Sequence, residues 1–194
     1  SRPNWATVKM QALRRPIRLL PKTTIFMECD IQTKLGSHIV KNDTVAHNAA
    51  RLCGVAGVLN IPVIATCHVE KNFGGIDPRI TEVTHDGRKV FPKTLFSMLE
   101  PPIYEHLKSI GGAPACEGED VRSNIVLYGV ETHVCVKQTC FDLIDKGYNV
   151  HLVVDAVSSM NHHDRNVGLE SMKANGAQVT TFQSLCFELL RDFQ

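Results

Sequence analysis

The sequence predicts a single-domain α/β protein built around a parallel sheet, and two observations support this. Apolar runs rich in β-branched residues alternate with segments of helical periodicity, which is the pattern of strands joined by crossover helices. The chain has 194 residues and 43% apolar composition, enough for one substantial core with little room for a second. We therefore expect one globular domain.

The first half of the chain supplies two buried strands and one long helix. Apolar runs over 23–29 and 61–67 are expected to be strands. The helix between them is predicted to begin at Asn42 or Asp43, since either side chain can cap a helix. Its buried face is a stripe at helical spacing, made of Val45, Ala49, Leu52, Cys53 and Ala56.

The middle of the chain predicts a third extended run, a short helix and another buried strand. The extended run closes near Lys93, where Pro92 favours a break in pairing. A short helix should begin at Pro101, and the apolar run over 124–130 reads as a strand after a loop over 111–120. A helix follows it and should end at Gly147, its buried stripe being Val136, Cys140, Leu143 and Ile144.

The last part of the chain predicts two strands and two helices. A strand over 150–154 leads to a helix that Asn161 and Asp164 should cap and that should end near Gly176. Val179 lies in a short last strand. The final helix is expected to bury Cys186, Leu189, Leu190 and Phe193.

The charge balance argues against a polyanionic partner. The chain has 21 Lys and Arg against 20 Asp and Glu, so nucleic acid could be held only by a local patch. Such a patch exists at residues 1–27, which carry six basic residues and no acidic one. We rank a solvated tail lying on the body of the protein first for this segment, ahead of a trimmed targeting segment or an RNA-attracting arm.

The cysteines and the hydropathy indicate where the protein works. Seven cysteines without a CxxC pair or a regular framework favour a reducing compartment. No apolar stretch approaches the roughly 20 residues of a membrane helix, so no membrane partner is expected. We expect a soluble intracellular protein, cytoplasmic first, with mitochondria as the alternative raised by the basic N-terminal segment.

Three polar residues far apart in the chain follow or end predicted strands. Asp30 follows the first strand, Lys93 closes the third extended run, and Cys135 follows the strand over 124–130. Open α/β sheets carry their ligands at the carboxyl ends of the strands. An acid, a cation and a thiol at one edge are the groups a cysteine hydrolase needs. Taken singly, each has an ordinary structural interpretation: Asp30 as a turn former, Lys93 as a surface lysine and Cys135 as a small buried hydrophobic residue. The other six cysteines keep that structural interpretation, Cys67 with the least support because it ends a strand.

Three motifs around these residues resemble those of the isochorismatase-like cysteine hydrolases. They are Phe26 to Gln32 (FMECDIQ), Lys93 to Met98 (KTLFSM) and Gly129 to Val136 (GVETHVCV), and they occur in the family's order. The likeness is nearest to the isochorismatase domain-containing proteins of eukaryotes and begins at about residue 22. It implies a basic extension over 1–21 and a hydrolase domain over 22–194. The implied fold has three α/β/α layers around a six-stranded, mostly parallel, doubly wound sheet.

The resemblance also implies a mechanism. Cys135 would be the nucleophile, Asp30 the group that takes and returns its proton, and Lys93 the cation that favours the ionised forms. A cis peptide bond would join Val130 to Glu131, and the amides of Glu131 and Cys135 would form the oxyanion hole. The implied reaction is hydrolysis of an amide or other C–N bond in a small substrate through a thioester. True isochorismatases cleave a vinyl ether with the acid alone, so the retained cysteine favours the amidase branch.

Further residues are expected near the site. Gln32 matches a family glutamine and should orient the loop after Asp30, with substrate contact as a second role. We expect the pocket to be lined by Gln32, Leu35, His68, Phe73, Phe96 and Thr132. Glu28 lies on the same side of its strand as Asp30, and its role stays open. It either pairs with a cation, tunes the site, or marks a partly wet strand end.

No metal and no cofactor are expected. Nicotinamidases of the superfamily hold a metal through an aspartate and histidines after the second strand, whereas the corresponding segment here, over 66–73, lacks that arrangement. His68 with Glu70 makes a weak ligand set.

Two other functional classes stay open beside the hydrolase. One is a binding or scaffold protein that retains the fold without catalysis. The other, with less support, is an RNA-processing role that uses the basic N-terminal segment. We also expect a homo-oligomer, as is common in the family, without deciding between a dimer and a tetramer.

Overall fold

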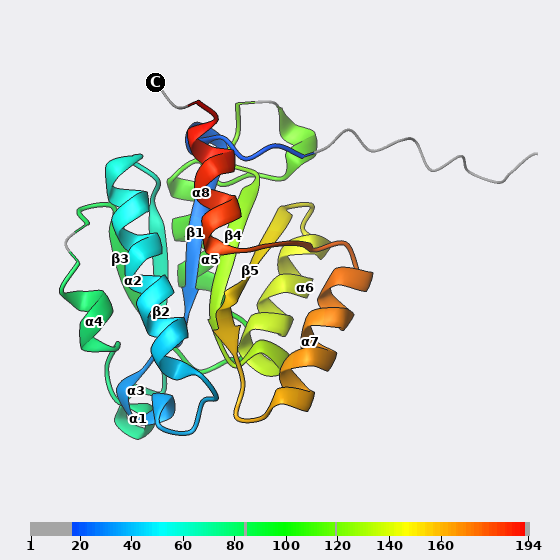
Figure 1. Ribbon diagram of the computed structural model, residues 1–194. Helices are drawn as coiled ribbons and strands as arrows, with labels where there is room; N and C mark the ends of the chain where they lie inside the picture. Colours follow the sequence, from blue (N-terminus) through cyan, green and yellow to red (C-terminus); the bar gives the residue numbers. More distant parts are fainter. Residues whose placement is uncertain (1–16, 84, 119, 193–194) are drawn as a thin grey trace, which may run out of the picture.

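One six-stranded sheet forms the centre of the protein in the computed structural model, which describes residues 17–83, 85–118 and 120–192 (Figure 1). The strand order is β3-β2-β1-β4-β5-β6, and every neighbouring pair runs parallel. The strands are β1 (Thr24–Cys29), β2 (Val63–His68), β3 (Arg88–Lys93), β4 (Asn124–Val130), β5 (Asn149–Ser158) and β6 (Gln178–Thr180). The predicted fold class is confirmed, with a sheet that is parallel throughout.

Helices cover both faces of the sheet (Figure 1). α2 (Asn42–Val58) and α8 (Phe182–Leu190) lie on one face. The opposite face carries α5 (Pro101–Ser109), α6 (Lys137–Asp145) and α7 (His162–Ala174). The shorter elements are α1 (Thr33–Gly36), α3 (Glu70–Phe73), α4 (Pro78–Thr81), the 3-10 turns η1 (Pro21–Thr23) and η2 (Ala115–Glu117), and the π-helical turn η3 (Thr132–Val136).

The central strands are mostly apolar and are buried along their whole length because both of their faces are covered. Every residue of β1 and β4 is buried. The predicted stripe of α2 is likewise buried and packs against the sheet. In the α6 region Val136, Cys140 and Leu143 are buried, whereas Ile144 is half-buried.

The helix ends follow the sequence signals in most places. The Asn161 side chain accepts a hydrogen bond from the Asp164 amide at 2.8 Å, which confirms the predicted cap of α7. Gly147 and Gly176 both have positive φ, of 84° and 106°, just beyond the ends of α6 and α7.

The prediction that Asn42 or Asp43 caps the start of α2 is wrong. Lys41, in a left-handed conformation, precedes the helix, and no side chain caps the helix. Asn42 and Asp43 lie inside the first turn. The Asp43 carboxylate instead accepts a hydrogen bond from Arg79 of α4 at 2.8 Å, so it serves a contact between two elements.

The final helix buries a different set of residues from the predicted one. Phe182, Leu185 and Leu189 face the core, whereas Leu190 is 54% exposed and Cys186 is half-buried. Consecutive helical residues are rotated by about 100°, so burying Leu189 turns Leu190 outward. Phe193 lies outside the described residues.

The described part of the N-terminal segment packs on the body. Leu19 is completely buried in the core, and its amide donates to the Glu188 carboxylate at 3.0 Å. Lys22 forms an exposed ion pair with Asp120. The domain boundary at residue 22 stays a prediction. Within the described ranges, no helix has both the length and the apolar character needed to cross a membrane.

The buried His151 on β5 predicts a pH-dependent loss of stability. Burial lowers the pKa of His151 from 6.5 to about 4. As the pH falls from about 6.5 to 4, His151 takes up a proton in the unfolded chain but stays neutral in the native protein. The free energy of unfolding should therefore fall by about 3 kcal/mol over this range. Urea denaturation of the wild type and of His151→Leu across this range should give a flatter pH profile for the variant. Parallel profiles would show that His151 does not control this loss.

Candidate active site

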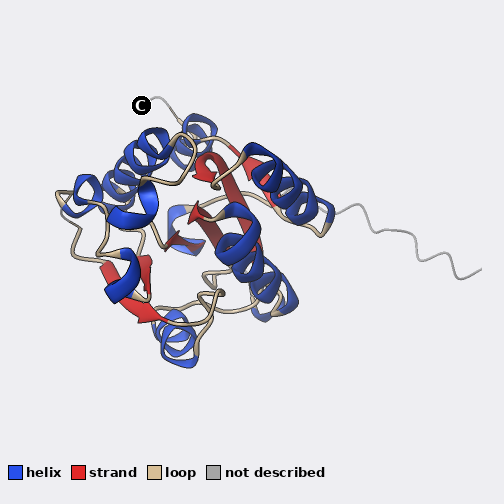
Figure 2. Ribbon diagram, turned by 90° about the horizontal axis from the view of Figure 1, so that it is seen from below, coloured by secondary structure: helices blue, strands red, loops and turns tan. Residues whose placement is uncertain are grey.

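Asp30, Lys93 and Cys135 meet at the carboxyl edge of the sheet. Figure 2 looks toward this edge, from below the view of Figure 1. Asp30 follows β1, Lys93 is the last residue of β3, and Cys135 lies in η3 directly after β4. Lys93 Nζ is 2.7 Å from Asp30 Oδ2, and the Cys135 sulfur lies within 4.8 Å of an Asp30 carboxylate oxygen. Asp30, Lys93 and Cys135 are 0%, 2% and 8% exposed, so bulk water screens their charges little.

The Lys93 ammonium is fully coordinated by protein groups. Besides its ion pair with Asp30, it donates to the carbonyl oxygens of Leu95 and Phe96, each at 2.9 Å. Burial by itself would lower the pKa of Lys93, but the acidic groups of Cys29 and Asp30 raise it above its ordinary value. Lys93 therefore stays charged at neutral pH.

The Asp30 carboxylate is fixed through both of its oxygens. Thr66 of β2 donates its hydroxyl to Oδ1 at 2.8 Å. Oδ2 contacts Lys93 and also accepts from the Cys29 thiol at 3.5 Å. Asp30 itself has a φ of 50°, a left-handed conformation that aspartate tolerates better than most residues. The sequence does not predict a role for Thr66 at the site, although its position near the end of the strand run over 61–67 indicates that it lies at the same edge.

Cys135 is positioned by the close approach of β4 to β1 and by the turn that follows. Gly129 has a φ of 124°, and a Cβ at this position would lie 2.0 Å from the Cys29 carbonyl oxygen, so only glycine fits. The Val130–Glu131 peptide bond is cis, as the resemblance implies. η3 then runs directly into α6, whose amino-terminal end favours an anion such as a thiolate.

Thr139 of α6 connects the cysteine turn to the loop after Lys93. Its hydroxyl donates to the Cys135 carbonyl at 2.7 Å and accepts from the Met98 amide at 2.9 Å. The sequence does not indicate this role of Thr139, because the position of a threonine inside a helix does not reveal which groups its hydroxyl contacts. The contact joins the third motif to the second.

The predicted pocket residues His68, Phe73 and Phe96 form a stack of rings beside the ion pair. The His68 ring centroid is 5.8 Å from that of Phe73 and 5.7 Å from that of Phe96. His68 Nδ1 lies 3.4 Å from Lys93 Nζ, and burial together with the Lys93 charge lowers the pKa of His68. His68 is therefore neutral at pH 7, and Phe96, at 50% exposure, gives the stack an open side.

Gln32 uses both ends of its amide to hold the loops of this edge. Its Nε2 donates to the Gly74 carbonyl at 2.5 Å, and its Oε1 accepts from the His68 amide at 2.9 Å. These two bonds tie the segment after Asp30 to the end of β2 and to Gly74, and the role of Gln32 in orienting the loop stays a prediction. Leu35 is 9% exposed and belongs to the core, and Thr132 is completely buried with no hydrogen-bond partner for its hydroxyl. A substrate contact by any of the predicted pocket residues stays a prediction.

Glu28 is an ion-paired core residue, and its interpretation as a partly wet strand end is wrong. It is completely buried, and its carboxylate contacts Arg88 of β3 at 2.7 Å. Burial raises the pKa of Glu28, and the Arg88 charge opposes that shift.

The same edge also offers donors that a metal could use. The ligand atoms of Cys29, Asp30 and Cys135 all lie within 4.8 Å of one another. The Lys93 ammonium, 2.7 Å from the same carboxylate, repels a second cation, and His68 turns Nδ1 toward that ammonium. These residues fit a protonated lysine and a nucleophile better than they fit a metal ion.

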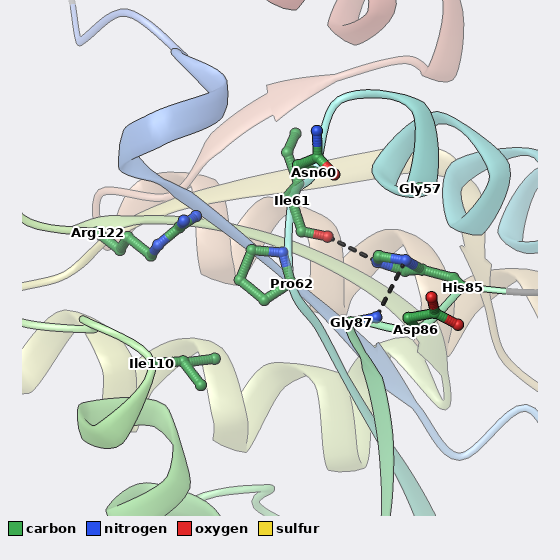
Figure 3. Close-up of a pocket in the computed structure, with 9 residues that line it drawn as sticks. All are labelled: Gly57, Asn60, Ile61, Pro62, His85, Asp86, Gly87, Ile110 and Arg122. Atoms are coloured by element: carbon green, nitrogen blue, oxygen red, sulfur yellow. Dashed lines mark hydrogen bonds between the residues drawn. The ribbon is translucent and has the colours of Figure 1, made fainter.

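A separate cavity of about 480 Å³ opens at the amino edge of the sheet, away from these residues (Figure 3). Within it His85 joins two loops, with Nε2 2.8 Å from the Ile61 carbonyl oxygen and Nδ1 accepting from the Gly87 amide at 3.3 Å. Its lining residues are Gly57, Asn60, Ile61, Pro62, His85, Asp86, Gly87, Ile110 and Arg122. No predicted site residue is among them.

A doubly wound parallel sheet with this polar cluster at its carboxyl edge defines an open α/β fold with a candidate ligand site beside the switch point of the strand order. The family model described as Isochorismatase domain matches residues 24–184. The chain belongs to the isochorismatase family.

Similar proteins support this assignment over most of the chain. Isochorismatase domain-containing protein 2 of Xenopus laevis is 39% identical over 183 residues, covering 94% of this chain and 83% of its own length. The secreted isochorismatase effector Isc1 of Phytophthora sojae is 37% identical, with coverages of 93% and 83%. Among solved structures, the MAR1 ribonuclease of Caenorhabditis elegans superposes with a TM-score of 0.82 at 36% identity, covering 91% of this chain and 85% of its own.

Removing one partner of the Glu28–Arg88 ion pair should destabilise the protein more than replacing both partners. Arg88→Met should destabilise the protein by about 3 to 5 kcal/mol, because it leaves a buried carboxylate without its partner. The double variant Glu28→Leu with Arg88→Met should recover most of that loss. Chemical denaturation of the wild type, the single variant and the double variant measures both effects. A double variant no more stable than Arg88→Met would contradict this account.

Proposed function

We propose that the protein is a cysteine hydrolase that cleaves an amide or other C–N bond in a small substrate. The observation that carries the proposal is the buried Asp30–Lys93 ion pair, with the Cys135 sulfur within 4.8 Å of the same carboxylate. A thiol with an ordinary pKa of about 8.5 needs a base or a cationic setting to react at neutral pH. Asp30 and Lys93 supply both.

In this mechanism Asp30 accepts the Cys135 proton as the sulfur attacks the substrate carbonyl. Collapse of the tetrahedral intermediate expels the amine, which takes that proton from Asp30, and leaves a thioester. Water, deprotonated by Asp30, then hydrolyses the thioester and restores the thiol. Lys93 holds one oxygen of the Asp30 carboxylate through the ion pair, and the Thr66 hydroxyl fixes the other oxygen.

The oxyanion formed in these steps needs hydrogen-bond donors. We assign that role to the backbone amides of Glu131 and Cys135, a device worth about 3 to 4 kcal/mol of transition-state stabilisation in other enzymes. The turn over Thr132–Val136, which contains Cys135 and directly follows Glu131, supports this assignment. The ring stack of His68, Phe73 and Phe96 is proposed as one wall of the substrate pocket.

Assembly and location are part of the proposal. An octameric hydrolase from Escherichia coli shares the fold, with a TM-score of 0.81 at 24% identity. We propose a homo-oligomer here as well, and the cytoplasm as its location.

Substitution of the three residues should abolish turnover, and Lys93→Ala should also destabilise the protein because it leaves the buried Asp30 carboxylate without its partner. Cys135→Ala, Asp30→Asn and Lys93→Ala should each lower kcat by about 10³-fold or more, because groups that act as a unit are not additive. The measurement is amine release from a panel of small amides, with circular dichroism as the fold control. Full activity of Cys135→Ala would exclude the thioester route, and a reaction that survives through Asp30 would point to acid catalysis.

Thiol reactivity tests the nucleophile without a known substrate. Substoichiometric iodoacetamide near neutral pH should label Cys135 faster than Cys116, although Cys135 is buried and Cys116 is exposed. The preference should vanish in Asp30→Asn, and peptide mapping by mass spectrometry reads it directly. Labelling of Cys135 no faster than Cys116 would favour a binding or scaffold protein on this fold.

A second candidate is RNA cleavage, favoured by the similarity to the protein whose name calls it a ribonuclease. If the same edge cleaves RNA, single-stranded RNA should be cut by the wild type and left intact by Cys135→Ala and Asp30→Asn. Binding should weaken steeply with salt if the basic N-terminal segment holds phosphates. Cleavage that persists in both variants would come from another site or a contaminant. Absence of binding at low salt would remove this candidate.

A further inference from the structure

A second thiol lies beside the proposed nucleophile and has no part in the hydrolytic mechanism. Cys29 is the last residue of β1 and is completely buried. Its sulfur and that of Cys135 are in one cluster with the Asp30 carboxylate, all within 4.8 Å. Cys53, Cys67, Cys116, Cys140 and Cys186 are not members of this cluster.

The backbone holds the two thiols together. In the parallel ladder, Cys29 is the partner of Gly129, and the absence of a side chain at Gly129 lets β4 approach the Cys29 carbonyl. Cys135 follows six residues later in the turn that folds back over this edge. The Cys29 thiol also contacts Asp30 Oδ2 at 3.5 Å, so a proton acceptor lies beside it.

We propose that Cys29 and Cys135 form a redox modification site in which peroxide oxidises Cys135 and Cys29 converts the product into a reversible intramolecular disulfide. The proposal rests on the proposed function insofar as Cys135 is the reactive thiolate. Cys29 is the resolving thiol. Its fully buried position beside Asp30 keeps it out of contact with bulk oxidant, whereas Cys135 is 8% exposed.

The chemistry balances in two steps. Asp30 takes the Cys135 proton, the thiolate attacks one oxygen of hydrogen peroxide to form a sulfenic acid, and the departing hydroxide takes that proton from Asp30 and leaves as water. Cys29 then transfers its proton to Asp30 and attacks the sulfenic sulfur, and the hydroxyl leaves as water by taking that proton. The dithiol has lost two electrons and two protons in total, and one peroxide has become two waters. An added dithiol reduces the bond by thiol–disulfide exchange.

The two sulfurs have to approach one another for the bond to form. A disulfide needs the sulfurs about 2.05 Å apart, and these begin within 4.8 Å of one another. The bond would remove the nucleophile and so stop hydrolysis. It would also intercept the sulfenic acid before a second peroxide converts it irreversibly to the sulfinic acid.

Peptide mapping of the oxidised wild-type protein tests the site directly. The reduced protein is treated with a few equivalents of hydrogen peroxide, the remaining thiols are blocked with iodoacetamide, and the protein is digested without reductant. The expected result is a peptide pair cross-linked through Cys29 and Cys135, which disappears after dithiothreitol. Cys135 recovered as sulfinic acid, as an unmodified thiol, or joined to another cysteine would overturn the proposal.

Variants separate resolution from general oxidation. Cys29→Ser keeps a hydroxyl beside Asp30 but cannot form the bond, so its Cys135 should proceed to sulfinic acid and stay oxidised after dithiothreitol. Cys29→Ala serves if the serine variant folds poorly. The matched control is Cys140→Ala, a buried cysteine of α6, which should cross-link as the wild type does. A Cys29→Ser variant that dithiothreitol restores as fully as the wild type would also overturn the proposal.

The iodoacetamide experiment distinguishes this inference from the proposed function. Rapid, Asp30-dependent labelling of Cys135 without cross-linking would leave the hydrolase proposal intact and exclude Cys29 as a resolving thiol. Cross-linking by peroxide with no turnover of any amide would support the modification site and argue against the hydrolase.

Discussion

The buried ammonium of Lys93 is the constraint on which the carboxyl edge of the sheet depends. An isolated charge in the interior is costly, so every polar group around this nitrogen has to keep its position. Asp30 supplies the opposite charge from β1, and two carbonyls from the loop after β3 complete the coordination. Thr139 then ties that loop to the turn of Cys135 through the Met98 amide. One lysine thereby joins the ends of β1, β3 and β4, although β3 lies at the sheet edge.

The strand order explains why the cluster forms where it does. β1 pairs with β2 on one side and with β4 on the other, so the chain reverses its direction of progress across the sheet at this point. The loops after β1 and β4 therefore diverge toward opposite faces, which opens the carboxyl edge between them. Asp30 and Cys135 stand on the two sides of this switch point. The fold brings together residues that share no local sequence context.

Sequence reasoning reached the strands and the three polar residues because their signals are local. A continuous apolar run can only be a covered strand or a buried helix, and the residue after it must lie at an edge. The Asp30 contact with Thr66 and the pairing of Glu28 with Arg88 depend on register between strands, which no single segment encodes. The predictions of the α2 cap and of a buried Leu190 failed as well. Lys41, not Asn42 or Asp43, holds the cap position of α2, and the rotation of α8 is set by its packing. The proximity of Cys29 to Cys135 could not be predicted from the sequence either, because it follows from the close approach of β4 to β1 at Gly129.

The pairing of β1 with β4 has a consequence for synthesis of the chain. Thr24 pairs with Asn124, so the first strand waits for a partner made about a hundred residues later. At the roughly 5–20 residues per second of translation, that delay is on the order of 5 to 20 seconds. During this delay one edge of a mostly apolar strand has no neighbour, which is the condition under which nascent chains recruit chaperones or aggregate. The polar cluster cannot assemble before that moment, so a ribosome-bound fragment ending before β4 carries Asp30 and Lys93 without the cysteine turn they surround.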